Sequence, residues 1–499
     1  MTPLLRRCDA LARVLQSREK VPFLLGYAAF CTVLNVPRRR GRGYSRSYPG
    51  VMLPKTNLAI VSGVRGARDL NLDRWRRRVF VGAWVGYAGY YFCRKNLSVL
   101  MPMLSRERSY SNLQFAHLIF AFSLAYVVGQ FISGFLSDRF GPRRVVATGA
   151  LVSVAATVLM GIWQNATLFL VLELANGLGQ STGWSGICKL MAAWFVRAER
   201  GVVMAWWSTS YVLGGFLATV FATWMVTNPL LLPELGWRRG MFGPALVLVI
   251  AAVFFFCVVR DNPRRAGLSV SLQEDEEDAG GELAASPRRS WALLLKNPNI
   301  QAIAAMYFLL KLARYSLLFW LPLYLSQKLR YSDERAGYTS SLFEMIGFLG
   351  PLLAGYASDR LLGSRRFPVG AVMLWALGLM CLVQPLANVA GFWGTAVSIS
   401  VIGILVYGPD TLMSASAVQD SARSADTGLS LGYVDGVGSC GQLVSGYVVA
   451  GIVQWFGWDS TFTLFAVVSI LAGLILASRW EPERRALLLA AAPAPEPVY

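Results

Sequence analysis

Long apolar runs recur along most of this 499-residue chain, with short polar stretches between them. Many runs approach the roughly 20 residues that cross a bilayer as a helix. They are continuously apolar rather than alternating, which favours helices over the strands of a barrel. The pattern predicts twelve transmembrane helices, at roughly 79–103, 112–136, 145–163, 167–195, 203–226, 239–259, 299–326, 336–357, 368–386, 393–417, 427–454 and 459–479.

Two features repeat along the chain at almost the same offset, about 220 residues. The segment GFLSDRFGPRR (134–144) returns as GYASDRLLGSRR (355–366), and Arg94 in the first predicted helix matches Arg314 in the seventh. Parallel six-helix repeats about an axis along the membrane normal describe the major facilitator architecture. We therefore expect an all-α membrane protein with the major facilitator fold.

The same pattern divides the chain into five regions. Residues 73–259 and 299–480 form the two predicted bundles, 260–298 a solvated cytoplasmic linker with an acidic run, and 481–499 a tail. Residues 1–72 are Arg-rich, and their apolar stretch from Pro22 to Val36 is short for a span. We interpret this extension as disordered, as a targeting segment, or as preceding a true start near Met52.

Composition narrows the chemistry. Only 15% of residues are charged, against about 25% in soluble proteins, and the net charge is +19. The Lys and Arg residues gather in loops on one side, so membrane topology rather than nucleic-acid binding explains them, and both termini should be cytoplasmic. One histidine (His117, expected to be packed), seven cysteines without metal-ligand spacing and no phosphate-binding loop argue against an enzyme, a metal, a cofactor or ATP.

Ionisable residues inside the predicted spans are the functional candidates. Each costs about 2.5–3.5 kcal/mol at the bilayer centre, so such residues normally face a cavity. Arg94 and Lys95 lie in the first helix, and Lys311 and Arg314 lie one turn apart in the seventh. Two buried guanidiniums suit a doubly charged oxyanion, above all phosphate. We expect the empty site to carry uncompensated positive charge.

Several segments resemble the organophosphate:phosphate antiporter family over about residues 73–480. They include GYAGYYFCRKNLSVLMPML (86–104), GLGQSTGWSGICKLMAAWF (177–195), RYSLLFWLPLYL (314–325) and YGPDTLMSASAVQD (407–420). The resemblance implies that Arg94 and Arg314 bind the substrate phosphate. It also implies a site lined by Lys95, Tyr87, Tyr91, Tyr126 and Trp184.

The chain departs from the family at three positions of the pocket. Gln130 replaces a lysine of the glycerol-3-phosphate transporter, Tyr211 a histidine, and Lys311 a tyrosine. We expect Lys311 to favour a substrate with extra negative charge, or to hold Glu344 when the site is empty. Glu344 is expected to pair with Arg314 or Lys311, or to form a static structural pair, whereas Glu173 has no assigned role.

The repeated loops carry Asp138 and Arg139 in one half and Asp359 and Arg360 in the other. In the superfamily such residues make cytoplasmic contacts that break during alternating access; simple topology charges are the other interpretation. Lys189 is expected to be structural, near a cytoplasmic helix end.

The resemblance implies a monomeric antiporter in the bacterial inner membrane that exchanges an organic phosphate for inorganic phosphate. The alternatives are a membrane sensor of sugar phosphates that signals through a partner kinase, and a proton-coupled transporter of another organic anion. A membrane carboxylate at the site, without paired arginines, would favour the last.

Overall fold

The computed structural model describes residues 58–163, 165–195, 197–268, 287–363, 365–422 and 427–480. Residues Arg65–Tyr499 form one compact unit, and every contact discussed below lies within it. Met1–Val64 form a separate unit, in which only the start of a helix at Leu58 is described. The other parts of the predicted N-terminal extension, and the C-terminal tail beyond residue 480, lie outside the described residues.

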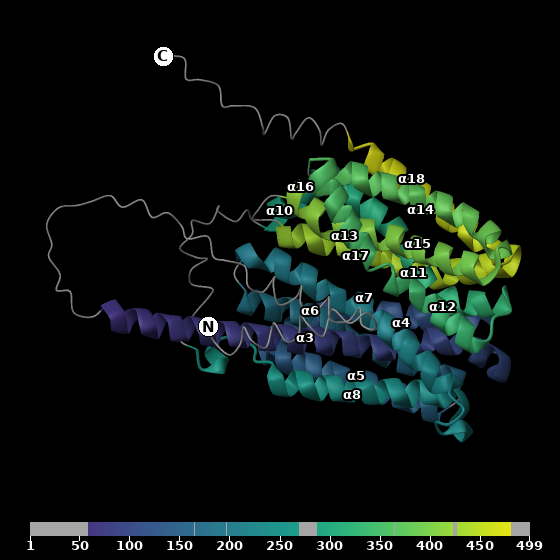
Figure 1. The fold of residues 1–499 in the computed structure, drawn as a ribbon, viewed down its shortest axis with the longest axis horizontal. Coiled ribbons are helices and arrows are strands. Elements are labelled where there is room, and N and C mark those ends of the chain that lie inside the picture. The colour runs from purple at the N-terminus through teal and green to yellow at the C-terminus, as the bar shows by residue number, and fades with distance from the viewer. Residues whose placement is uncertain are drawn as a thin grey trace, which may run out of the picture. The chain divides into compact units, whose positions relative to one another are not determined.

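The first half of the chain is a group of long helices (Figure 1). They are α3 (Leu58–Arg108), α4 (Asn112–Phe140), α5 (Pro142–Ile162), α6 (Ala166–Trp194), α7 (Arg197–Thr227) and α8 (Arg239–Val258), with a short 3-10 turn η1 (Pro233–Arg238) before α8. Side-chain caps at Ser111 and Asn165 satisfy the first backbone N–H groups of α4 and α6. These starts lie within a few residues of the predicted ones, except that α3 begins at Leu58 rather than near residue 79.

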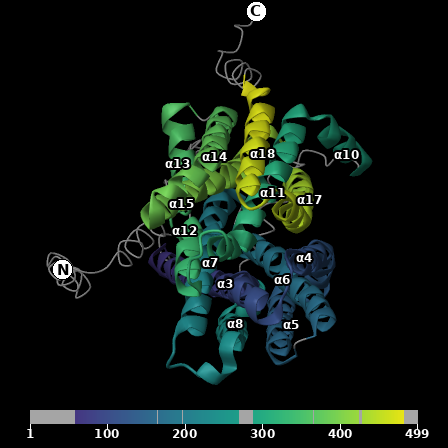
Figure 2. The same cartoon turned by 90° about the vertical axis from the view of Figure 1, so that its right-hand side faces the viewer.

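The second half repeats this arrangement with shorter pieces (Figures 1 and 2). It comprises α10 (Pro287–Lys296), α11 (Pro298–Gln327), α12 (Asp333–Met345), α13 (Leu349–Tyr356), η3 (Ala357–Leu361), α14 (Arg366–Val389), α15 (Gly391–Thr411), η4 (Leu412–Ala417), α16 (Val418–Ser421), α17 (Thr427–Phe456) and α18 (Asp459–Ala477). Helix α10 lies where the sequence predicted only a linker.

Two predicted helices of this half are interrupted. The span predicted at 336–357 breaks between α12 and α13, because the Pro351 ring has no N–H to donate to the Gly347 carbonyl. The span predicted at 393–417 passes into the π-helical segment η4 at Leu412, two residues after Asp410. Such π segments often occur at functional sites.

Among the described residues, ten helical segments are long and apolar enough to cross a membrane. Helices α3 and α6 are not among the ten, and these two carry buried polar side chains such as Arg94, Lys95, Glu173 and Gln180. The chain is therefore an integral, multi-pass membrane protein with a helical fold. The count of twelve spans stays a prediction.

The two halves meet at one end of the helices. The Ser98 hydroxyl of α3 donates to the Phe319 carbonyl of α11 at 2.7 Å, and Arg106 pairs with Asp333 at the start of α12. Gln442 of α17 donates to Ser123, in the first half of α4, at 3.3 Å. All of these contacts lie toward the end of α3 that finishes at Arg108, so the described structure is closed at that end.

Candidate functional site

Arg94 lies in the second half of α3 and is 4% exposed. Its Nε donates to Gln180 Oε1 at 2.8 Å, and the rings of Tyr91 and Tyr126 lie 4.8 and 4.7 Å from the guanidinium. One terminal nitrogen is buried without a hydrogen-bond partner, and no carboxylate of the described residues forms an ion pair with this group. Because a buried cation is costly without a counter-charge, this free edge suits an incoming anion.

A chain of hydrogen bonds fixes Arg94 from behind. Gln180, which accepts from Arg94, donates to Asn176 Oδ1 at 3.1 Å, and Asn176 donates to Glu173 Oε2 at 3.2 Å. Ser153 also donates to Asn176 Oδ1, at 2.5 Å. Glu173, Asn176 and Gln180 project from α6 at i, i+3 and i+7, which places these three side chains on one face of the helix. Glu173 thus lies at the far end of a network that orients Arg94.

Arg314 in α11 is 6% exposed and, unlike Arg94, is paired with a carboxylate. One terminal nitrogen donates to both oxygens of Asp410 in α15, each at 2.8 Å. The rings of Tyr407 and Tyr211 lie 4.8 and 5.2 Å from the guanidinium. The Nε of Arg314 is buried without a partner, so a second acceptor can still bind this group.

Tyrosine rings connect the two arginines. Tyr91, which contacts Arg94, lies 6.5 Å from Tyr211 with the rings nearly parallel, and Tyr211 contacts Arg314. The Tyr211 hydroxyl also lies 3.5 Å from Asp410 Oδ2. The structure therefore brings the arginines from the two halves to one aromatic layer in the protein interior.

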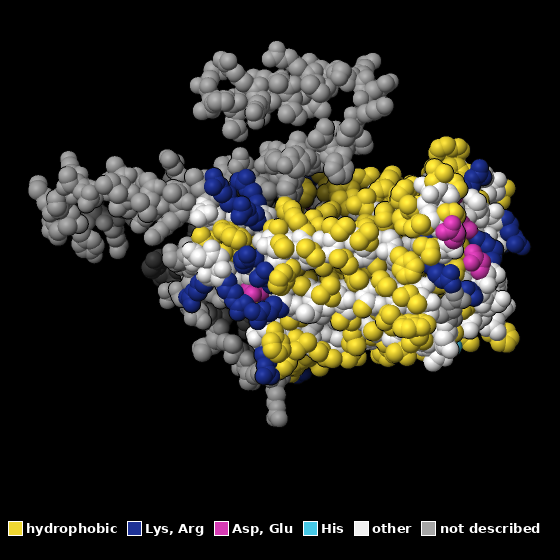
Figure 3. Space-filling model, turned by 90° about the horizontal axis from the view of Figure 1, so that it is seen from below, with side chains coloured by type: hydrophobic (Ala, Val, Ile, Leu, Met, Phe, Trp, Pro, Cys, Tyr) yellow, Lys and Arg dark blue, Asp and Glu magenta, His cyan; other side chains and the backbone are white. Residues whose placement is uncertain are grey.

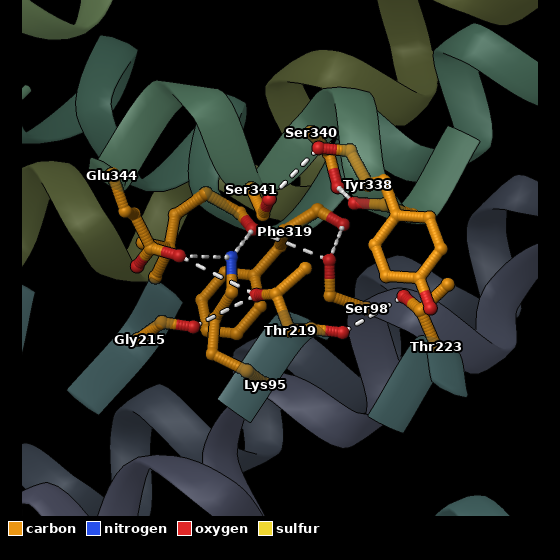
Figure 4. Close-up of polar contacts among 12 residues, drawn as sticks. Lys95, Ser98, Gly215, Thr219, Thr223, Phe319, Tyr338, Ser340, Ser341 and Glu344 are labelled. Atoms are coloured by element: carbon orange, nitrogen blue, oxygen red, sulfur yellow. Dashed lines mark hydrogen bonds and ion pairs between the residues drawn. The ribbon is translucent and has the colours of Figure 1, made fainter. Parts of the chain in front are cut away.

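Lys95 faces a different neighbour from Arg94 (Figure 4). Its Nζ donates to the Leu318 carbonyl at 2.8 Å and lies 3.5 Å from Glu344 Oε2, while Thr219 lies 3.4 Å from the same oxygen. Successive residues of a helix are about 100° apart, so Lys95 points to α11 and α12 when Arg94 points to α6. The expected pairing of Glu344 with Arg314 or Lys311 is wrong.

Lys311 pairs with a residue that the sequence reading did not consider. Its Nζ lies 2.6 Å from Asp435 Oδ1 and 3.3 Å from the Ser439 hydroxyl, both in α17. The alternative that Lys311 holds Glu344 is therefore also wrong. The Asp435 side chain is 37% exposed, so this pair is accessible to solutes.

Three of the four site cations are thus compensated in this structure, and the expectation of a wholly uncompensated site is wrong. The charged groups and their partners are Lys95 with Glu344, Lys311 with Asp435, Arg314 with Asp410, and Arg94 without a carboxylate among the described residues.

Other predicted site residues lie at varying distance from this cluster. Tyr87 is buried, with its ring 5.9 Å from Tyr91 and 6.0 Å from Trp184, so it connects Trp184 to the cluster. Gln130 is part-buried one turn after Tyr126, and its carbonyl accepts from Ser133. The described contacts of Gln130 do not include either arginine.

The loop residues are tied within their own halves. Asp138 forms an ion pair with Lys189 of α6, and the Arg139 guanidinium lies 5.5 Å from the Phe140 ring. In the second half, Asp359 pairs with Arg366 at 2.5 Å, and Arg360 is exposed. The His117 ring lies edge-on to Tyr447 at 5.6 Å, but the residue is exposed, so a packed histidine stays a prediction.

Sequence reasoning missed Asp410, Asp435 and Gln180. Both aspartates lie inside predicted spans, so the rule that drew attention to Arg94 applied equally to them. Gln180 lies in a segment that was quoted for its family resemblance, but a neutral amide inside a span carries a weaker signal.

The profile of the Major Facilitator Superfamily matches residues 83–409 and 331–497. The chain is 29% identical over 430 residues to the glycerol-3-phosphate transporter of Bacillus subtilis (strain 168), covering 84% of this chain and 95% of that protein. It is 27% identical over 438 residues to a probable hexose phosphate transport protein of Chlamydia muridarum (strain MoPn / Nigg), covering 83% and 92%. It is also 28% identical over 417 residues to the membrane sensor protein UhpC of Escherichia coli (strain K12), covering 82% and 93%.

A solved structure with a similar fold is a bacterial homologue of the human lysosomal transporter Spinster, in an inward-facing and unoccupied conformation. The TM-score is 0.62 at 13% identity, covering 84% of this chain and 99% of that one. At this identity the likeness concerns the fold alone.

Proposed function

Because the chain belongs to the Major Facilitator Superfamily, and is a membrane protein of a transporter fold rather than an enzyme, we propose that it exchanges an organic phosphate ester for inorganic phosphate by alternating access. One observation carries the proposal: two buried arginines, one from each half, meet at a single layer of tyrosine rings. A phosphate dianion can accept from both forks at once, whereas a carboxylate offers less charge and fewer acceptors.

The substrate class is a sugar phosphate or glycerol phosphate. The names of the relatives, a glycerol-3-phosphate transporter and a probable hexose phosphate transport protein, support this class. The pocket differs from the glycerol-3-phosphate transporter at Gln130, Tyr211 and Lys311. We expect the Lys311–Asp435 pair, 2.6 Å apart and partly exposed, to select among the ester groups.

Substrate phosphate competes with Asp410 for Arg314. Asp410 holds one terminal nitrogen of Arg314 in the empty site, and Arg94 keeps a free edge. Phosphate therefore binds Arg94 first and then displaces Asp410, or shares Arg314 through its free Nε. Asp410 therefore acts as the counter-ion that lets Arg314 stay charged in the protein interior when no substrate is bound.

The proposal of alternating access is supported by the position of the contacts between the two halves. The described contacts between the halves lie at the site, through Lys95 and Tyr211, and from there toward the end of α3 that finishes at Arg108. With both termini cytoplasmic, this end is the external one, and the state is inward-facing. We propose that the transporter acts as a monomer in the bacterial cytoplasmic membrane. It contacts the lipid bilayer and does not bind nucleic acid.

The test is phosphate exchange in proteoliposomes loaded with phosphate, assayed across a panel of organic phosphates. Arg94→Lys and Arg314→Lys should each abolish most exchange, because an ammonium keeps the charge but loses the planar fork. Arg238→Lys, outside the site, is the matched control and should exchange normally. Full activity in both site variants would contradict the assignment.

Two alternatives have specific support. Similarity to a membrane sensor protein favours a sensing role, which growth on a sugar phosphate in a host without its own uptake system would exclude. The buried carboxylates Asp410 and Glu344 are the groups that a proton-coupled carrier needs. Uptake that depends on a pH gradient, in vesicles without internal phosphate, would favour that carrier over an exchanger.

A further inference from the structure

A cavity lies away from the arginine pair, between the first part of α3 and the end of α8. The cavity has a volume of about 610 Å³. Its lining residues are Trp75, Arg77, Arg78 and Val81 of α3, Phe254, Cys257 and Val258 of α8, and Arg260 just beyond. The volume falls within the range of small-molecule pockets, about 300–1,000 Å³.

Glycines of α3 pack closely against α8, and these two helices form the walls of the cavity. Gly82, Gly86 and Gly89 recur along one face of α3, and a Cβ on them would lie 2.6 Å from Val259, 3.0 Å from Phe255 and 2.5 Å from Ala251. Small residues let membrane helices approach this closely. Beyond Gly82 the larger side chains of Trp75, Arg78 and Arg260 separate the helices and leave the hollow.

The three guanidiniums of the cavity have no counter-charge among the described residues. Arg78 and Arg260 lie 5.5 and 6.0 Å from the same Trp75 ring, so two like charges share one indole. The nearest acid in sequence to Arg260, Asp261, is already engaged by Arg265 and by the backbone N–H of Arg143. Arg77 is exposed and forms no ion pair with a described residue.

The other wall of the cavity is apolar and lies at the edge of the membrane-spanning surface. Val81 and Phe254 are exposed, and Phe254, Cys257 and Val258 belong to the last turns of the span that ends at Val258. Figure 3 shows this face of the molecule, with a broad hydrophobic band that has Lys and Arg side chains at both of its ends. A ligand here meets cations at one end and a hydrocarbon-facing surface at the other.

We propose that this cavity binds an anionic phospholipid, whose phosphate accepts from Arg77, Arg78 and Arg260 while its acyl chains lie along Val81, Phe254 and Val258. Basic pockets between helices at the membrane surface recognise such headgroups. A free phosphate ion would satisfy the arginines but leave the apolar wall bare, which is why a lipid fits the site better. The proposal is independent of the transported substrate.

The test uses the full-length protein purified in detergent and titrated with phosphatidylglycerol or phosphatidylcholine, with bound lipids resolved by native mass spectrometry. The double substitution Arg77→Gln/Arg78→Gln should weaken binding of the first phosphatidylglycerol molecule by at least about tenfold. It should leave phosphatidylcholine binding unchanged. The unchanged phosphatidylcholine binding also shows that the variant is folded. Arg260→Gln should reduce the same binding step independently.

The control is Arg144→Gln/Lys296→Gln, which removes the same charge from exposed positions outside the cavity. It should bind phosphatidylglycerol as the unmodified protein does. An equal loss of phosphatidylglycerol binding in both double variants would indicate general attraction between the basic surface and anionic lipid. That result would contradict the proposed lipid site. Displacement of the lipid by millimolar inorganic phosphate would overturn it too, because the cavity would then bind the free anion.

Discussion

At the scale of single residues, the site is defined by which cations have carboxylate partners. Arg314 has Asp410 at 2.8 Å, whereas Arg94 has only neutral acceptors and tyrosine rings. The two arginines are equivalent in sequence position but differ in electrostatic state. This asymmetry gives two opposite predictions for substitutions that change no more than one or two atoms.

Asp410→Asn removes the counter-ion of Arg314 and nearly keeps its shape. The empty protein should become less stable, because a buried charge is left unpaired. Phosphate should then bind roughly tenfold more tightly, about 1.4 kcal/mol, since it no longer competes with a carboxylate. The measurement is thermal unfolding in detergent with and without phosphate, where ligand stabilisation should be larger in the variant. Weaker phosphate binding would instead mean that Asp410 positions Arg314.

Gln180→Glu makes the reverse change at Arg94. It places a carboxylate oxygen where the amide now accepts from Arg94 Nε at 2.8 Å, so it supplies a competing anion. Phosphate affinity should fall by about tenfold. Glu173→Gln is the matched control at the far end of the same hydrogen-bond chain, and it should bind phosphate within about twofold of the unmodified protein. An unaffected Gln180→Glu protein would refute the role of the free edge of Arg94.

Sequence could indicate the arginines but not their partners. An ionisable residue inside a span is visible from hydropathy, and Arg94, Lys95, Lys311 and Arg314 were found in that way. Whether Lys311 meets Glu344 or Asp435 depends on which face of α11 packs on α17, and the printed chain does not contain that information. The same lack of packing information explains why Glu173 had no role until Asn176 and Gln180 were seen beside it.

At the scale of helices, the boundaries were predicted where hydropathy decides and missed where it does not. The start of α14 at Arg366 and of α18 at Asp459 lie within two residues of the predicted starts. Helix α3 continues toward its N-terminus through a charged segment, which hydropathy excludes by definition. The break between α12 and α13 was readable from Pro351, but the π segment after Asp410 was not.

The contact between α7 and α12 gives a prediction about the conformational change. A Cβ on Gly337 of α12 would lie 2.6 Å from Thr223 Cγ2 and 2.9 Å from Thr223 Cβ, across the closed end between the halves. Gly337→Ala should therefore disfavour this state relative to the one open at that end. Alkylation of Ser105→Cys, which lies at the closed end beside Gln327, should become several-fold faster, on the order of threefold or more.

The control for this change is Gly451→Ala in α17, where a Cβ would meet nothing within 4 Å. Both substitutions favour helix to a similar extent, so only the contact differs. Equal alkylation in Gly337→Ala and Gly451→Ala would show that this crossing does not set the equilibrium between states.

At the scale of the whole molecule, charge compensation links binding to movement. In the proposed alternating access, the protein must enclose the site away from water on both sides to pass between its two open states. In the empty protein three cations keep their carboxylates during this step, but Arg94 keeps a buried nitrogen without a partner. An unpaired charge costs more as the surroundings become less polar, so we expect the empty protein to pass between these states slowly. In the exchange mechanism proposed above, bound phosphate would supply the missing acceptor and connect Arg94 of one half with Arg314 of the other. It would therefore stabilise the enclosed state more than the open ones.

This difference predicts an exchanger. Phosphate inside vesicles should accelerate uptake of labelled phosphate from outside by at least about tenfold, a barrier difference near 1.4 kcal/mol. The measurement is the initial uptake rate into matched phosphate-loaded and phosphate-free proteoliposomes. Only Arg94, of the four site cations, lacks a carboxylate partner among the described residues. This charge imbalance is smaller than that of a site with four unpaired cations, so we expect slow residual uptake into empty vesicles. Equal rates in the two preparations would contradict obligate exchange, because the empty protein would then return as fast as the loaded one.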